Sequence, residues 1–188
     1  NEGYPDMNLA EYRKALQRAK RELSTALDGE AQVVGMDAAA LVEQRVVSTG
    51  RKADGTTFSP YSTKKVPAYY YFGRSLNQSG ERSIRDKARR REGVSYRDFR
   101  QYNGRNVNVK NFQFTGRMWQ GFGVKNVTKL RLGVYRIELG GKTTYSERLL
   151  GFHNQRENTD LGEVSTREAQ QVKAALIIRV QKILDKYV

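Results

Sequence analysis

The chain has 188 residues and carries 34 Lys and Arg against 20 Asp and Glu, a formal net charge of +14. It contains no Cys and one His, which excludes disulfides, thiolate metal sites and cysteine nucleophiles and leaves little room for a histidine-based triad. The length and a 38% hydrophobic content predict one domain, residues 1–188, with a small core. The charge favours an anionic partner, and a merely solvated basic surface is the alternative.

Two helices are predicted in the first 50 residues. The first shows apolar side chains at spacings of three and four, which places them on one stripe: Leu9, Tyr12, Leu16, Ala19, Leu23 and Leu27. We expect Asp28-Gly29 to end it. A second helix should begin at Asp37 and end at Thr49-Gly50, because glycine readily adopts the left-handed conformation of a helix terminus.

Residues 61–111, called the arm below, are rich in basic and aromatic side chains and poor in aliphatic ones. Aliphatic residues are too few for a separate core, so the sequence predicts an extended, loosely structured insertion with some helix near 81–92. Between 81 and 110 there are ten Lys or Arg against four Asp or Glu. The candidate contacts with an anionic partner are Arg82, Arg85, Lys87, Arg89, Arg90, Arg91, Tyr96, Arg97, Phe99, Arg100 and Tyr102.

Two kinds of anionic partner fit this composition. An acidic groove on a neighbouring protein is favoured, since Tyr and Arg most often anchor interfaces. Direct contact with nucleic acid, through phosphates and stacked bases, is the alternative. Four consecutive aromatics, Tyr69, Tyr70, Tyr71 and Phe72, are predicted to form a subunit interface, with core packing as the competing interpretation.

Strand patterns follow the arm, in MWQGFGVKN and LRLGVYRIEL. In the second, the apolar alternation changes phase at Gly133-Val134, which predicts a β-bulge. Capping-box patterns at Thr144 with Glu147 and at Ser165 with Glu168 predict a short helix and a long final helix.

The predicted fold is α+β, an antiparallel sheet packed by the N-terminal and C-terminal helices. The expected core combines the strands with the last helix: Trp119, Phe122, Leu132, Ile137, Leu176, Val180 and Ile183.

No catalytic motif is apparent. The chain lacks a phosphate-binding loop, HExxH and GxSxG, and its acidic residues are not paired as magnesium ligands would be. A lone histidine such as His153 more often makes a structural hydrogen bond than acts as a base. The sequence therefore predicts a protein that is not an enzyme and that uses no cofactor or metal. No apolar run approaches the roughly 18 residues of a spanning helix, so no membrane partner is expected.

Three segments in order resemble the phage virion-morphogenesis and tail-completion family, the Mu-like neck and tail proteins. LVEQRVVSTGRKADGTTFSPYSTKK is similar to a helix ending in glycine, followed by a DG turn, an aromatic residue and a proline. FTGRMWQGFGV is similar to the family's TG turn into a strand, and YSERLLGFHNQ to its segment with a histidine near a helix end. The resemblance covers roughly residues 38–60 and 112–188.

The resemblance implies a structural virion protein, made in the host cytoplasm and located in the neck or tail of a bacteriophage. It implies a homo-oligomeric ring that joins the portal side of the head to the tail, with neighbouring portal, neck or tail proteins as partners and possible contact with packaged DNA. A non-enzymatic nucleic-acid-binding protein that acts through the arm is the alternative function.

Overall fold

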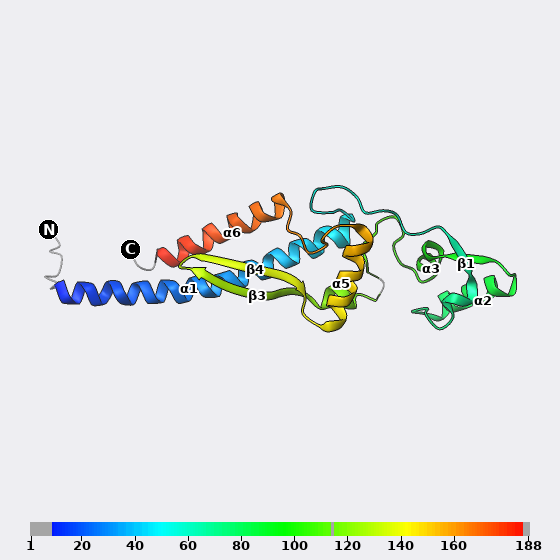
Figure 1. The fold of residues 1–188 in the computed structure, drawn as a ribbon, viewed down its shortest axis with the longest axis horizontal. Helices are drawn as coiled ribbons and strands as arrows, with labels where there is room; N and C mark the ends of the chain where they lie inside the picture. Colours follow the sequence, from blue (N-terminus) through cyan, green and yellow to red (C-terminus); the bar gives the residue numbers. More distant parts are fainter. Residues whose placement is uncertain (1–8, 114, 186–188) are drawn as a thin grey trace.

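The computed structural model describes residues 9–113 and 115–185. Its elements in chain order are α1 (Leu9–Gln44), the π-helical turn η1 (Arg45–Thr49), β1 (Lys65–Pro67), the 3-10 turn η2 (Ala68–Tyr71), α2 (Gln78–Arg89), β2 (Gly93–Ser95), α3 (Tyr96–Tyr102), α4 (Arg117–Gln120), β3 (Phe122–Arg131), β4 (Val134–Gly141), α5 (Thr144–Glu157) and α6 (Thr166–Leu184). Strands β1–β2 and β3–β4 form two small antiparallel sheets, so the predicted α+β class is confirmed. The molecule is elongated, with the arm at one end and the first turns of α1 at the other (Figure 1).

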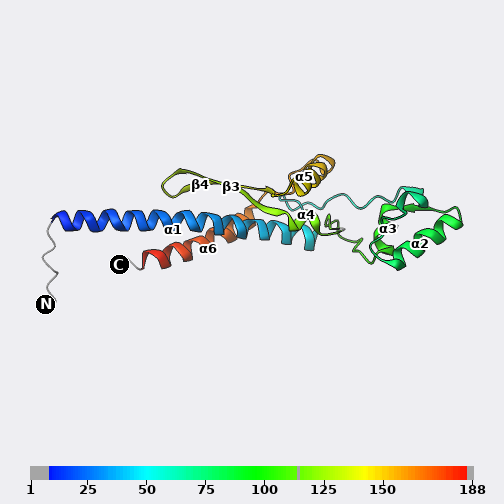
Figure 2. The ribbon, with the colours of Figure 1, turned by 90° about the horizontal axis from the view of Figure 1, so that it is seen from below.

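One continuous helix replaces the two helices predicted before Gly50. Gly29 lies inside α1 with open space where a side chain would be, so it costs about 1 kcal/mol relative to alanine. The helix runs through it because the flanking turns are rich in Ala, Leu and Glu, and its second half packs against the β3–β4 hairpin and α6 (Figure 2). Asp37, the predicted cap, instead accepts a 2.7 Å bond from Arg179 of α6. The predicted end at Gly50 is confirmed, with φ +62°.

The segment LRLGVYRIEL contains the end of β3, a hairpin turn and most of β4, and is not one bulged strand. Strand β3 ends at Arg131, and β4 begins at Val134. Gly133 lies between the two strands and has φ +72°. A tight hairpin turn needs such a positive φ, and glycine adopts it most easily. The change of phase in the apolar alternation at Gly133-Val134 therefore marks the reversal of the chain, and the predicted bulge there is wrong.

Trp119 lies on a single helical turn, α4, before the strand begins. Gly116 makes the expected bend with φ +80°, but the chain then forms α4 and enters β3 only at Phe122. Gly121 leaves room for the start of α5, because a Cβ there would lie 2.6 Å from Ser146 Oγ. The absence of a side chain at Gly121 therefore allows the start of α5 to lie close to the backbone there.

Both later helices begin with a capping box. At α5 the box joins Thr143 and Ser146, one residue before the predicted position at Thr144. At α6 the predicted box of Ser165 and Glu168 is confirmed.

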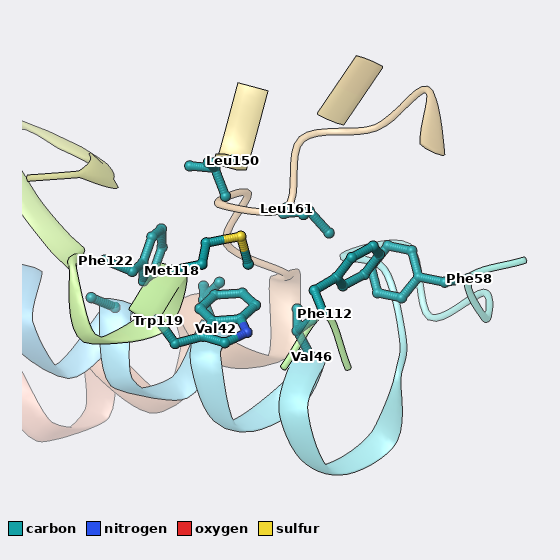
Figure 3. Packing of buried hydrophobic residues seen from close by; sticks show 10 residues of the cluster. Val42, Val46, Phe58, Phe112, Met118, Trp119, Phe122, Leu150 and Leu161 are labelled. Carbon is teal, nitrogen blue, oxygen red and sulfur yellow. The ribbon is translucent and has the colours of Figure 1, made fainter. Parts of the chain in front are cut away.

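The main core lies where the end of α1 meets α4, α5 and both ends of the arm (Figure 3). Trp119 and Phe122 are buried as predicted and pack edge to face at 5.4 Å between ring centroids. Leu132 is 52% exposed in the hairpin turn, so its predicted place in the core is wrong. The other predicted members, Ile137, Leu176, Val180 and Ile183, are only half-buried, because the hairpin and α6 each lie against α1 outside this cluster. The cluster consists of Ala39, Val42, Val46, Phe58, Phe112, Met118, Trp119, Phe122, Leu150 and Leu161.

The arm is folded, which corrects the expectation of a loosely structured segment. It holds β1, η2, α2, β2 and α3, and β1 pairs with β2 from Lys65 opposite Ser95 to Pro67 opposite Gly93. A second core of Ala68, Ile84, Val94 and Phe99 lies inside it. Aromatic rings supply the apolar area that aliphatic side chains lack: Tyr71, Tyr96 and Tyr102 pack around this core.

Candidate interaction surfaces

The basic residues of the arm divide into paired and unpaired sets. Ion pairs join Arg85 to Glu81 at 3.1 Å, Lys87 to Glu92 at 2.6 Å and Arg89 to Asp86 at 3.4 Å. These contacts use three of the four acidic side chains, and the fourth, that of Asp98, caps α3. The arginines of the arm that form no ion pair within the described chain, and that are all exposed, are Arg74, Arg82, Arg90, Arg91, Arg97 and Arg105.

Three aromatic residues expected to contact a partner belong to the interior of the arm. Phe99 is 3% exposed and stacks on Tyr71 at 4.5 Å between ring centroids. Tyr96 and Tyr102 are half-buried against the same core. Their spacing of three therefore reflects the inner face of α3 and its N-terminal turn, and Phe99 does not reach a partner.

Arg100, another expected partner contact, is 1% exposed and organises the base of the arm. Its guanidinium donates to the carbonyl oxygens of Asn106 and Gln113 and to Asn111 Oδ1, at 3.1 to 3.2 Å, and lies 4.2 Å from the ring centroid of Tyr61. A buried arginine bonded to several carbonyl acceptors is a structural group, because moving it to a partner would leave those acceptors unsatisfied.

The aromatic run of η2 is split between the surface and the interior. Tyr69 and Tyr70 are 61% and 55% exposed, and their rings stack 5.3 Å apart with planes inclined by 20°. Phe72 is also exposed, with the Arg85 guanidinium 5.5 Å from its centroid. Tyr71 packs inward on Phe99. Three of the four residues predicted to form an interface are thus on the surface.

The arm is fixed to the body of the molecule by buried contacts. Phe58 and Phe112, on the two segments that connect it, pack edge to face at 4.9 Å. Lys110 pairs with Glu157 of α5 at 2.5 Å, and both side chains are almost fully buried. Trp119 Nε1 donates to the Asn111 carbonyl at 3.1 Å. The position of the arm is therefore set by packing and buried polar bonds.

His153 borders a cavity of about 330 Å³ between the base of the arm and α5, which Tyr61, Lys110 and Arg156 also line. Its ring packs on Phe112 at 4.8 Å, and its buried Nδ1 has no hydrogen-bond partner among the described residues, so that nitrogen makes no structural hydrogen bond of the kind predicted for His153. Burial, aided by the positive charges of Arg156 and Lys110, lowers the pKa of His153 to about 4. The imidazole is neutral at pH 7.

The first turns of α1 expose the apolar stripe that the spacing of three and four predicts. Leu9, Tyr12 and Leu16 are 66%, 51% and 52% exposed. Further along, Lys129 and Tyr135 of the hairpin both bond to Asp28, so the tip of the hairpin is attached to the middle of α1 (Figure 2). The first turns of α1 extend beyond both the hairpin and α6 (Figure 1). The pattern correctly finds the stripe, but periodicity alone cannot show which turns are covered.

No helix among the described residues is both long and apolar enough to span a membrane, and no group of three or more His, Asp or Glu side chains in that part of the chain is placed to hold a metal ion. Comparisons with family models, with curated proteins and with solved structures find no match to the chain.

Proposed function

We propose that the chain is a structural subunit of a homo-oligomeric ring in the neck or tail of a bacteriophage virion. The observation that carries the proposal is an excess of exposed surface. The accessible area is 13159 Å² for 21.5 kDa, whereas a compact monomer of this mass exposes about 9,200 Å². The difference of about 4,000 Å² is several times the roughly 800 Å² that one partner contributes to a standard interface.

The exposed apolar side chains give this surface the character of an interface. They occur on the first turns of α1, at the hairpin tip and on α6: Leu9, Tyr12, Leu16, Leu130, Leu132, Ile177 and Ile178. Apolar groups on several faces suit a head-to-tail contact, in which different patches of neighbouring copies meet and a closed rotation makes a ring.

The order of short motifs supports placing this ring in a phage neck or tail. The helix ending at Gly50, the bend at Gly116 and the helix bearing His153 follow one another as in the family that the sequence resembles. A non-enzymatic role is consistent with these surfaces, which join subunits and partners and carry out no reaction.

The test of assembly is the native mass of the purified chain, measured by light scattering after size exclusion, together with negative-stain images. The expected result is one species whose mass is a fixed multiple of 21.5 kDa and whose images show rings. A monodisperse monomer at every concentration examined would refute the ring.

The test of location is antibody labelling of virions from the phage that encodes the chain. Label at the junction of head and tail, or along the tail, is expected. Purified infectious particles that lack the protein would exclude a virion role, even for a chain that forms rings.

A further inference from the structure

One groove on the arm combines an exposed aromatic ring with two cations. The groove has a volume of about 450 Å³ and lies between β1, the start of η2 and the loop after α2, where Lys65, Tyr69, Arg91 and Glu92 line it. Glu92 is neutralised within the arm, because its carboxylate accepts a 2.6 Å bond from Lys87. Lys65 and Arg91 form no ion pair with any described residue, so the groove has a net positive charge.

Arg91 has a backbone conformation that favours glycine. Its φ is +55°, at the position where the end of α2 turns back: its N–H bonds to the Ala88 carbonyl, and the Glu92 N–H bonds to the Lys87 carbonyl. This pair of bonds is the Schellman motif, whose left-handed residue is usually glycine because any Cβ is unfavourable there. An arginine at this position destabilises the turn and places a cation at the groove, a combination that indicates a role outside folding.

The tyrosines beside the groove offer flat, exposed ring faces. Tyr69 and Tyr70 are stacked on each other with more than half of each side chain exposed. No described ring other than Tyr70 stacks on Tyr69. Aromatic faces beside unpaired cations are the arrangement with which proteins bind single-stranded nucleic acid, since bases stack on the rings while Lys and Arg contact phosphates.

We propose that this groove binds a single-stranded polynucleotide, with phosphates at Lys65 and Arg91 and a base on Tyr69. An acidic peptide is disfavoured because Tyr96, Phe99 and Tyr102, the residues suited to anchor a protein groove, are packed inside the arm. A second copy of the chain is also disfavoured. The arm has 13 Lys and Arg against 4 Asp and Glu, and the remaining residues are net positive as well, with 21 against 16.

The experiment measures binding of the full chain to labelled oligo(dT), by fluorescence anisotropy over a range of salt concentrations, with a duplex of equal length and polyglutamate as competitors. Tyr69→Ala is expected to weaken binding about 5- to 100-fold. Arg91→Gly is expected to weaken it several-fold and to reduce the slope of log affinity against log salt by about 0.7, the value for one lost phosphate contact on a single strand.

Two matched controls and a stability measurement make the outcomes decisive. Arg136→Gly and Tyr145→Ala alter exposed residues of the body and should leave affinity unchanged. Arg91→Gly should leave the thermal midpoint unchanged or raise it, which a purely structural role for Arg91 does not allow.

The proposal is overturned by absence of binding at low salt, by equal losses in the control variants, by a lowered midpoint in Arg91→Gly, or by equally strong competition from duplex or polyglutamate. Binding by a monomeric chain would support this groove while refuting the ring, so the two proposals fail separately.

Discussion

The ion pair between Lys110 and Glu157 is the most consequential pair of residues at the base of the arm. Both side chains are buried, and Ser59 Oγ also donates to Glu157 at 2.9 Å. Removing one partner leaves an uncompensated buried charge, so Lys110→Met or Glu157→Leu alone should lower the free energy of unfolding by about 3–5 kcal/mol. The double variant should recover most of this loss, because it removes both charges. Chemical denaturation of the four proteins measures the coupling, and additive losses would contradict it.

His153 should make stability depend on pH between about 6.5 and 4. Its pKa is about 4 in the folded chain and roughly 6.5 when unfolded, so protons bind the unfolded state preferentially as the pH falls through this window. Full burial would correspond to about 3 kcal/mol lost by pH 4, and partial solvent exposure reduces our expectation to roughly 1–2 kcal/mol. His153→Leu should flatten the dependence measured by urea denaturation at pH 7, 6 and 5. An unchanged slope would show that the ring is solvated.

Glu157 acts in a lower pH range and does not interfere with that measurement. Desolvation raises its pKa, but hydrogen bonds from Lys110 and Ser59 and the charge of Lys110 outweigh this effect and leave the pKa below its ordinary value of 4.5. A carboxylate with a depressed pKa contributes stability that is lost only as the pH falls through the folded value. The ion pair therefore stays intact at pH 7, 6 and 5, where the His153 measurement is made.

Two glycine-to-alanine substitutions test how whole helices and strands pack. Gly29→Ala should raise the free energy of unfolding by about 0.5–1 kcal/mol, because the site is open, lies within α1 and has helical geometry. Gly141→Ala should lower it by about 1–3 kcal/mol or more, since its Cβ would meet the backbone nitrogen of Glu147 at the start of α5. Thermal unfolding of both variants measures the two changes in stability. Opposite signs are expected, and destabilisation by Gly29→Ala would mean that α1 bends there.

Local chemistry determines which elements the sequence could predict. The cap at Ser165, the end of the helix at Gly50 after η1 and the α+β class depend on neighbouring residues and are confirmed. The break at Gly29 and the bulge at Gly133 are wrong because tertiary packing and a chain reversal produce patterns that periodicity does not distinguish. The arm core was missed because rings contributed by a 3-10 turn and a helix, such as Tyr71 on Phe99, replace aliphatic packing. The basic composition of the arm predicts Arg91 as a contact with an anionic partner, but its positive φ is visible only in three dimensions.

At the scale of the whole molecule, assembly should depend on the first turns of α1. Leu16→Glu places a charge on the exposed apolar stripe, so the native mass should fall while the thermal midpoint stays unchanged. Gln17→Glu adds the same charge to an exposed polar position next to it and should leave the mass unchanged. Light scattering on the two variants checks this, and an equal effect of both would implicate net charge instead of the stripe.

The continuity of α1 has a geometric consequence for any such assembly. Its 36 residues make a rod about 54 Å long, attached near its C-terminal end to the rigid base of the arm. A neighbour docked on Leu9 and a partner held by the arm are then separated by a set spacing and also by a set rotation about the rod axis. Four residues inserted near Gln17 would add about 6 Å and turn the tip by roughly 40°, whereas seven would add about 10 Å and nearly restore the angle. The length of α1 therefore sets both the distance between the two contacts and their relative rotation about the helix axis.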